Sequence, residues 1–324
     1  MEKSPTSSAV RWRAYLSNNW PAALGLAVAL AVVIFLLAQS VVRIAGGEAP
    51  AGVVNALLGG VAAAAATALG ALPAILLRGI SQKLEDSLLG MAAGMMLAAS
   101  AFSLILPGLD AAETMLGSKL GSAGVVVTGM ALGVMLMLGL ERFTPHAHEA
   151  VGVSGPGSER YGRVWLFVFA IVLHNLPEGM AIGVSFARND LSVGLPTTLA
   201  ISLQDLPEGL AVALSLRSIG FGAWRSVLVG GASGLVEPLG ALLGIGLSSG
   251  FALAYPTGLG LAAGAMIFVV SHEVIPETHR NGHQTMATLG LMAGFCPDDG
   301  ARYGAWLVVL NCFFGSSCFL LAPV

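Results

Sequence analysis

The sequence predicts an all-α protein, a polytopic bundle of helices that cross a lipid bilayer. Hydrophobic residues make up 56% of the chain and charged residues only 10%, and the mean hydropathy is +0.82. A soluble globular domain carries far more charge than this. Several segments of about 20 mostly apolar residues are each long enough to cross roughly 30 Å of hydrocarbon. The 43 glycines and the alanine-rich runs are typical of membrane helices that pack closely.

The polar breaks between the apolar runs give the order of the predicted spans. Residues 1–19 are polar and are expected to form a cytoplasmic N-terminal segment. The apolar run at 20–42 is too long for the core of a signal peptide, so we predict an uncleaved first span there. One transmembrane domain is expected over residues 20–295, because the breaks are short. Its further spans are expected at 51–79, 85–107, 121–143, 163–187, 192–217, 223–249 and 254–276, with a last one beginning near 284.

The basic residues predict the direction of the spans, because cytoplasmic loops carry an excess of Lys and Arg. With the N-terminus in the cytoplasm, most of them fall inside: Lys3, Arg11, Arg13, Arg78, Lys83, Arg142, Arg160, Arg163, Arg217, Arg225 and Arg280. Arg43, Lys119 and Arg188 fall outside, and Arg302 is undecided. We therefore expect a multi-pass protein of the cell (inner) membrane whose N-terminus is cytoplasmic.

The longest loop, residues 144–162, is cytoplasmic in this arrangement. It carries His146, His148 and Glu149, followed by a stretch rich in Gly and Ser. Two interpretations stay open, a flexible solvated connector and a weak metal-catching loop.

One phrase occurs twice in neighbouring spans, as HNLPEGMA at residues 174–181 and as QDLPEGLA at residues 204–211. Polar and ionisable side chains within hydrocarbon are costly and mark function by default. Pro177 and Pro207 each remove a helical hydrogen bond, and such broken helices occur in membranes where the freed backbone lines a polar cavity. The pair of phrases therefore predicts two walls of a polar site inside the membrane.

Helical geometry groups the polar residues of the two phrases. Residues four apart share one face of a helix. The pairs at this spacing are His174 with Glu178 and Gln204 with Glu208. Asn175 and Asp205 lie one residue further on, so they project about a quarter turn away, toward a second, adjacent position.

Another carboxylate, Glu237, precedes Pro238 in the next span, and an earlier span offers Met95 and Met96 with Ser100 and Ser103 below them. Taken alone, the two methionines are typical of packing. If Glu178, Asp205, Glu208 and Glu237 are ionised, about four negative charges lie at bilayer depth, and two divalent cations would neutralise them. Imidazole, carboxylate and thioether together suit Zn²⁺, Cd²⁺ or Fe²⁺ better than Ca²⁺ or Mg²⁺. The pattern therefore predicts a transition-metal site inside the membrane.

Further polar groups lie near the predicted ends of two spans. Asp110 and Glu113 come just past the outer end of one helix, where they would attract cations. A second set lies at the inner end of another helix, where it would receive an ion on exit: His272, Glu273, Glu277, His279 and His283. For His279 and His283, an ordinary polar helix end is an equal alternative.

At these residues the sequence resembles the ZIP (Zrt-, Irt-like protein) family of divalent-metal transporters, in particular its bacterial member of known structure. The resemblance extends from about residue 59 to residue 295, and the paired phrases are specific to that family. It implies an eight-helix core in a 3+2+3 arrangement with an inverted repeat, here with one extra N-terminal transmembrane helix. It also implies a homodimer that moves metal into the cytoplasm by alternating access, through an elevator-like slide of the helices that carry the site.

The resemblance further implies how two metal ions are held in each chain. One ion is held by Met96, His174, Gln204 and Glu208. The second is held by Asn175, Asp205 and Glu237, with Glu178 and Glu208 bridging the two. Asp110 matches the family's acid at the outer entrance, and His272 and Glu273 match its inner exit residues. We place Ser103 on the transport pathway as well.

The C-terminus departs from the family pattern. After Phe295 the chain reads CPDDGAR at 296–302 and then becomes apolar from about 305 to 322. Pro297 and Gly300 should break the family's last helix here. Residues 296–324 are therefore expected to be an atypical tail, which contains either the last span or the product of a shifted reading frame.

We therefore expect a transporter of Zn²⁺, Cd²⁺ or Fe²⁺ rather than an enzyme, with the metal ions, the lipid bilayer and a second copy of the chain as partners. The net charge of −3 gives no reason to expect a nucleic-acid partner, and no nucleotide-binding loop of the Gly-x₄-Gly-Lys-Ser/Thr type is present. An intramembrane zinc protease would use His-Glu-x-x-His, but Pro276 stands where the second His would follow His272 and Glu273. A metal-gated cation channel is the other alternative.

Overall fold

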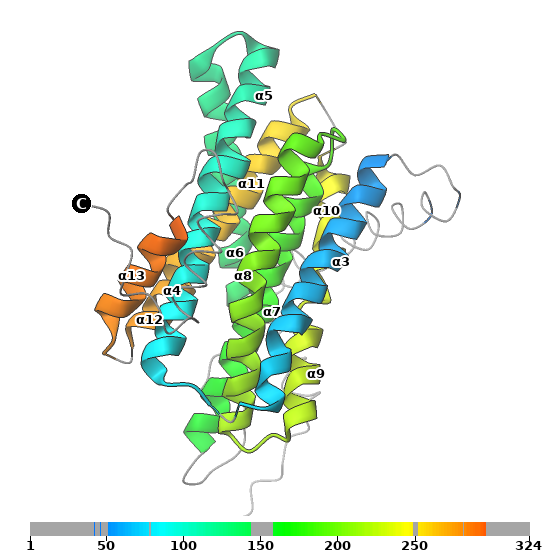
Figure 1. Cartoon of the computed structure of the whole chain (residues 1–324). Coiled ribbons are helices and arrows are strands. Elements are labelled where there is room, and N and C mark those ends of the chain that lie inside the picture. Colours follow the sequence, from blue (N-terminus) through cyan, green and yellow to red (C-terminus); the bar gives the residue numbers. More distant parts are fainter. Residues whose placement is uncertain are drawn as a thin grey trace, which may run out of the picture. The chain divides into compact units, whose positions relative to one another are not determined.

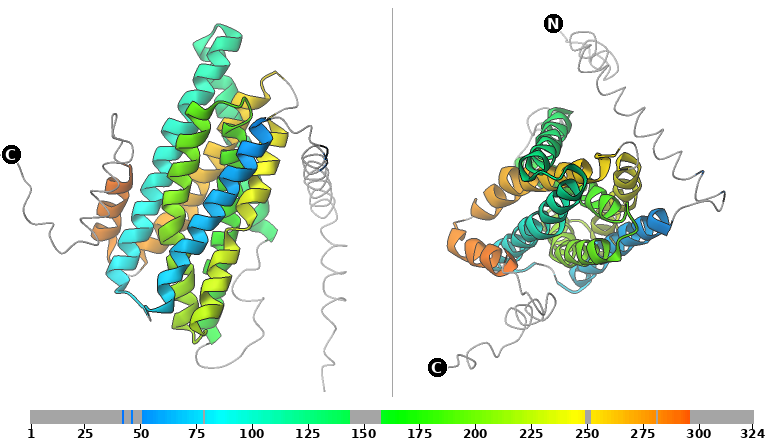
Figure 2. Two further views of the ribbon diagram at one scale, coloured as in Figure 1. Left: turned by 45° about the vertical axis from the view of Figure 1, so that its right-hand side comes forward. Right: turned by 90° about the horizontal axis from the view of Figure 1, so that it is seen from above.

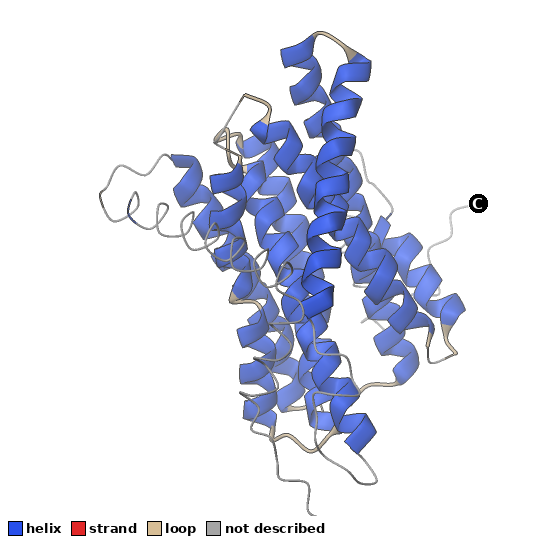
Figure 3. Cartoon of the chain, turned by 180° about the vertical axis from the view of Figure 1, so that it is seen from behind, coloured by secondary structure: helices blue, strands red, loops and turns tan. Residues whose placement is uncertain are grey.

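The computed structural model of the chain describes residues 51–77, 79–143, 158–248, 252–280 and 282–295, together with Val42 and Gly46. Residues 1–49 and residues 50–324 form two separate units, and the helices described here belong to the second. Every element in these ranges is helical, as predicted (Figure 3). The predicted span at 20–42, the loop residues His146, His148 and Glu149, and the tail at 296–324 lie outside the described residues, apart from Val42.

The described helices follow the predicted spans closely (Figure 1). Seven of them, counted within the described residues, are long and apolar enough to cross a membrane. The elements are α3 (Ala51–Ala71), η1 (Leu72–Ile75), α4 (Gln82–Ala98), η2 (Ala99–Ile105), α5 (Leu106–Leu116), α6 (Lys119–Phe143), α7 (Ser158–Ser185), α8 (Leu191–Ser218), α9 (Ala223–Ser233), α10 (Val236–Leu247), α11 (Ala254–Val269), η3 (Val270–Val274), α12 (Ile275–His279) and α13 (Gln284–Phe295). The short helix α13 begins where the last span was predicted to begin.

Two spans pass through a proline by way of a π-helical segment. Proline has no N–H and would interrupt an α-helix. Before Pro107, the N–H of Leu106 bonds to the carbonyl of Ala101, five residues back, and η2 leads directly into α5. Pro276 follows η3 in the same way. The predicted helix end near residue 107 is therefore wrong, because this span continues to Leu116.

The prolines of the two repeated phrases lie inside their helices, as predicted, whereas the next span contains a break that was not predicted. Helices α7 and α8 continue without a break through Pro177 and Pro207. The span predicted at 223–249 is present as a single candidate span at Ala223–Leu247, and it consists of two helices, α9 and α10, separated by Gly234 and Leu235. This break places Glu237 in the first turn of α10.

The helices pack in two groups (Figure 2). The site group consists of α3, α7, α8, α9 and α10, in which α3 packs along α8 and α7 along α10. The flanking group consists of α4, η2, α5, α6, α11, η3, α12 and α13, in which α4 packs along α13 and α6 along α11. The groups meet where α4 contacts α8 and where α11 contacts α7.

The glycine that follows the Glu of each repeated phrase, called the closing glycine, allows a very close helix crossing. A Cβ atom built on Gly179 would collide with the backbone carbonyl oxygen of Glu237 in α10. A Cβ atom built on Gly209 would collide with the backbone carbonyl oxygen of Thr67 in α3. Small residues at such crossings let membrane helices approach each other closely. These two crossings bring α10 and α3 to the level of the polar residues on α7 and α8.

Candidate metal centre

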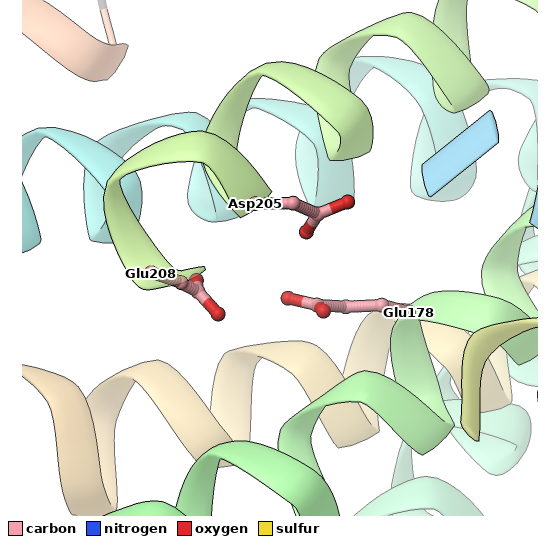
Figure 4. A group of neighbouring side chains, drawn as sticks. All are labelled: Glu178, Asp205 and Glu208. Atoms are coloured by element: carbon pink, nitrogen blue, oxygen red, sulfur yellow. The ribbon is translucent and has the colours of Figure 1, made fainter. Parts of the chain in front are cut away.

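Three carboxylates from the two repeated phrases meet inside the bundle. Glu178 projects from α7, and Asp205 and Glu208 project from α8 toward it (Figure 4). One oxygen atom of each carboxylate lies within 4.8 Å of the others, and all three side chains are buried. The α-helical spacing predicted from the phrases therefore brings these groups to one place, and such a group of carboxylates could hold a metal ion.

Amide side chains orient two of the carboxylates. The Nε2 of Gln204 donates to Oε1 of Glu178 at 2.6 Å. The Nδ2 of Asn175 donates to Oε1 of Glu237 at 3.3 Å, so that the first turn of α10 joins the cluster. Each amide thereby uses its nitrogen within the protein and leaves its oxygen free to face the site.

His174 links the cluster to the flanking group. Its Nε2 lies 2.8 Å from Oε2 of Glu273 in η3, and the imidazole is only 2% exposed. We expected Glu273 on the inner exit route, and the structure places it directly against a predicted ligand. The neighbouring His272 is exposed, and its ring stacks on that of Phe268 with centroids 5.0 Å apart.

The unsatisfied polar atoms of the described residues are concentrated at this cluster. Ten buried side-chain nitrogen or oxygen atoms have no hydrogen-bond partner, and one of these is the hydroxyl of Ser226. The other nine belong to predicted ligands: Nδ1 of His174, Oδ1 of Asn175, Oε2 of Glu178, Oε1 of Gln204, both carboxylate oxygens of Asp205, both of Glu208, and Oε2 of Glu237. Buried polar groups in native proteins nearly always have partners, so a concentration of this kind needs an explanation. All nine are acceptors of the kind that a cation would satisfy.

The remaining predicted site residues lie on the flanking group. Met96 is fully buried on α4, and Ser103 lies half-buried in η2. Asp110 is exposed on α5. It was expected just past a helix end, together with Glu113, and both instead lie on the helix that continues beyond Pro107. The roles of Met96, Ser103 and Asp110 toward a metal stay predictions.

The two histidines with alternative interpretations have structural partners. Nδ1 of His279 lies 2.8 Å from the backbone oxygen of Ile275, within its own helix. Nδ1 of His283 lies 2.9 Å from Oδ2 of Asp86, a buried residue near the start of α4. The contact of His279 stays within α12, whereas that of His283 joins the segment just before α13 to α4.

Two partners of predicted residues, one at the cluster and one at the start of α4, were missed by the sequence analysis. The hydroxyl of Thr67 on α3 donates to Oε1 of Glu237 at 2.9 Å. Asp86, the partner of His283, was not singled out either. A single threonine in the run AAAAATALG carries little signal, and Asp86 stands in the polar run SQKLEDS at residues 81–87, where an acid is ordinary.

Comparison with known proteins gives consistent matches. The profile of the family described as ZIP Zinc transporter matches residues 141–297. The chain is 64% identical over 284 residues to Zinc transporter ZIPB of Bordetella bronchiseptica, covering 88% of this chain and 92% of that protein. It is 41% identical over 245 residues to Zinc transporter GufA of Myxococcus xanthus, covering 76% and 95%. It is also 42% identical over 151 residues to human Zinc transporter ZIP11, covering 43% of each chain.

Proposed function

The chain belongs to the ZIP zinc transporter family, and from that premise we propose that it carries Zn²⁺ across the membrane into the cytoplasm. Related divalent ions such as Cd²⁺ and Fe²⁺ would be alternative substrates. Members of this family are transporters rather than enzymes, and the chain is a multi-pass membrane protein.

The observation that carries the proposal is the set of nine buried acceptor atoms without partners. Four of the residues that own them are carboxylates, Glu178, Asp205, Glu208 and Glu237. Ionised carboxylates are very costly in a low-dielectric interior unless positive charge compensates them. No Lys or Arg within the described residues forms an ion pair with any of the four. Two divalent cations would neutralise about four negative charges and satisfy the free acceptors.

We propose that the two ions share the cluster as follows. Gln204, Glu208 and His174 hold one ion together with the thioether of Met96. Asn175, Asp205 and Glu237 hold the second, and Glu178 and Glu208 bridge the two. This assignment is supported by the acceptor atom without a partner on each oxygen or nitrogen ligand. The place of Met96 is supported by the contact of its helix α4 with α8.

The ligand set favours an ion that is bound and then released. Structural zinc sites are closed and rich in thiolates, which bind the ion too firmly for a carrier. The nine free acceptors are instead eight oxygens and one imidazole nitrogen from three helices. Such a mixed set retains borderline transition metals with less affinity than a thiolate site.

Alternating access would move the site group against the flanking group, with Asp110 and Ser103 on the outer side and His272 and Glu273 on the inner side. The packing pattern supports the inverted repeat on which this movement depends. In such a repeat, α3, α4 and α6 correspond to α9–α10, α11 and α13, and α8 corresponds to α7. The contact of α3 with α8 then has its counterpart in the contact of α10 with α7. The pairing of α4 with α13 likewise becomes that of α11 with α6. A homodimer with cytoplasmic N-termini completes the proposal.

Zinc uptake into proteoliposomes that contain a zinc-sensitive dye tests this function. We expect Glu208→Gln and His174→Ala each to reduce uptake to the level of empty vesicles, because each removes a ligand from the cluster. Thr128→Val is a matched control, since its hydroxyl bonds the backbone of its own helix α6 at 2.7 Å. Uptake at the wild-type rate by both ligand variants would refute the site. Flux that stays linear in zinc concentration at channel-like rates would refute the carrier.

A further inference from the structure

We propose that Thr67 is a positioning residue for the metal centre, because its hydroxyl fixes the carboxylate of Glu237 so that one oxygen faces the ion. The inference rests on the proposed function, in which Glu237 is a metal ligand.

The contact between the two side chains is buried and short. Thr67 is 1% exposed and Glu237 is fully buried. Oγ1 of Thr67 lies 2.9 Å from Oε1 of Glu237 and 3.3 Å from the backbone oxygen of Ala63, one helical turn earlier. A hydroxyl has a single hydrogen to donate, and the shorter distance assigns it to Glu237.

The hydrogen bonds on Glu237 are all on one oxygen. Oε1 accepts from Thr67 and also from Nδ2 of Asn175 at 3.3 Å, whereas Oε2 is buried without a partner. Glu178 is held in the same way, with Gln204 on Oε1 and no partner on Oε2. Rotation of the Glu237 carboxylate would break the bond from Thr67. The side chain is therefore held with a single oxygen available for the ion.

At the crossing of α8 with α3, Thr67 takes the place that the proposed ligand Glu237 takes at the crossing of α7 with α10. Gly179 of α7 lies against the backbone of Glu237, and Gly209 of α8 lies against the backbone of Thr67. Thr67 and Glu237 thus occupy corresponding places relative to the two phrases. At this place α10 supplies the carboxylate of Glu237, and α3 supplies the hydroxyl of Thr67 that orients it.

The break between α9 and α10 leaves room for this contact. A Cβ atom built on Gly234 would lie 2.9 Å from Oγ1 of Thr67 and 3.0 Å from Oε1 of Glu237. Both distances are shorter than an ordinary van der Waals contact. Any larger residue at 234 would press directly on the two atoms that form the hydrogen bond.

The test measures zinc stoichiometry and affinity of the purified full-length protein in detergent, by metal analysis and competitive titration. We expect Thr67→Val, which keeps the shape of the side chain and removes the hydroxyl, to lower the affinity for one of the two zinc ions about 10- to 100-fold. Thr67→Ala should give the same loss, and Thr67→Ser, which keeps the hydroxyl, should bind as wild type does. The matched control is Thr197→Val, whose buried hydroxyl bonds only the backbone of Val193, at 2.7 Å.

A second arm asks whether Thr67 acts through Glu237. In a Glu237→Gln background, Thr67→Val should cause no further loss of zinc affinity, because the oriented carboxylate is already gone. An equal loss in both backgrounds would overturn the positioning role. So would wild-type affinities for both ions in Thr67→Val. Zinc-free wild-type protein would instead refute the proposed function itself, so the two failures are distinguishable.

Discussion

Each amide at the metal centre is oriented by the partner of its nitrogen. Because Gln204 donates to Glu178 and Asn175 donates to Glu237, the amide oxygens of both residues are left without partners. The assignment of nitrogen and oxygen follows from this hydrogen-bond network. In the proposed site the amides would therefore act twice, as donors that hold a carboxylate and as acceptors for an ion.

His174 has the arrangement that is usual for a metal-binding histidine. Such a ligand commonly donates one ring N–H to a carboxylate, which fixes the tautomer and leaves the other nitrogen for the metal. Nε2 of His174 lies 2.8 Å from Glu273, and Nδ1 is buried without a partner. With the proton on Nε2, the lone pair of Nδ1 is available to an ion.

At the scale of helices, the closing glycines set the distance between the walls of the site. We expect Gly179→Ala to destabilise the protein by about 1–3 kcal/mol, because the added methyl group overpacks a close crossing. It should also weaken zinc binding, since the atom that must move is the backbone carbonyl oxygen of Glu237. Thermal unfolding in detergent and zinc titration measure the two effects.

Gly124→Ala is the matched control for this substitution. Gly124 lies in α6, and a Cβ atom built on it would meet no atom within 4 Å. Its replacement should leave zinc binding unchanged and stabilise the helix by up to about 1 kcal/mol. Equal behaviour of the two variants would show that the crossing at Gly179 does not position Glu237.

Most of the helices and the polar residues of the buried cluster could be predicted because both depend on local patterns. Apolar runs gave the spans, and i to i+4 spacing placed Glu178 and Glu208 on inward faces. The π-helical passages at Pro107 and Pro276 were not predicted. A proline signals an interruption of the α-helical hydrogen bonds, but whether the helix ends or re-forms there depends on the packing around it.

Contacts between distant segments were also beyond reach of local patterns. Thr67 and Glu237 are separated by 170 residues, and His174 and Glu273 by 99. Neither partner can be identified without knowing that α3 crosses near α10 and that η3 lies beside α7. Local patterns therefore predicted which polar side chains gather in the cluster better than they predicted what holds those side chains.

At the scale of the whole described unit, few polar contacts join the site group to the flanking group. One is the contact of His174 with Glu273. Another is made by Arg188, between α7 and α8, which donates to the sulfur of Met115 at 3.3 Å and lies 4.5 Å from the ring centroid of Tyr255. A slide of one group past the other would have to separate Arg188 from these partners.

We expect a cross-link between Arg188→Cys and Met115→Cys, made with a bifunctional thiol reagent, to stop zinc uptake while leaving zinc binding intact. The control pair, Phe102→Cys with Phe295→Cys, lies within the flanking group, where the two ring centroids are 6.0 Å apart. That cross-link should leave uptake unchanged. Undiminished uptake by the fully cross-linked Arg188 and Met115 variant would contradict movement between the groups.

We propose that divalent ions sit among the buried carboxylates of α7, α8 and α10. Anomalous diffraction at the zinc absorption edge, from crystals of the wild-type protein grown with Zn²⁺, tests it most directly. We predict two anomalous peaks per chain, each about 2.0–2.2 Å from oxygen or nitrogen atoms of the ligands assigned above. Crystals with no zinc between Glu178, Asp205, Glu208 and Glu237, or with zinc only at surface histidines, would contradict the account.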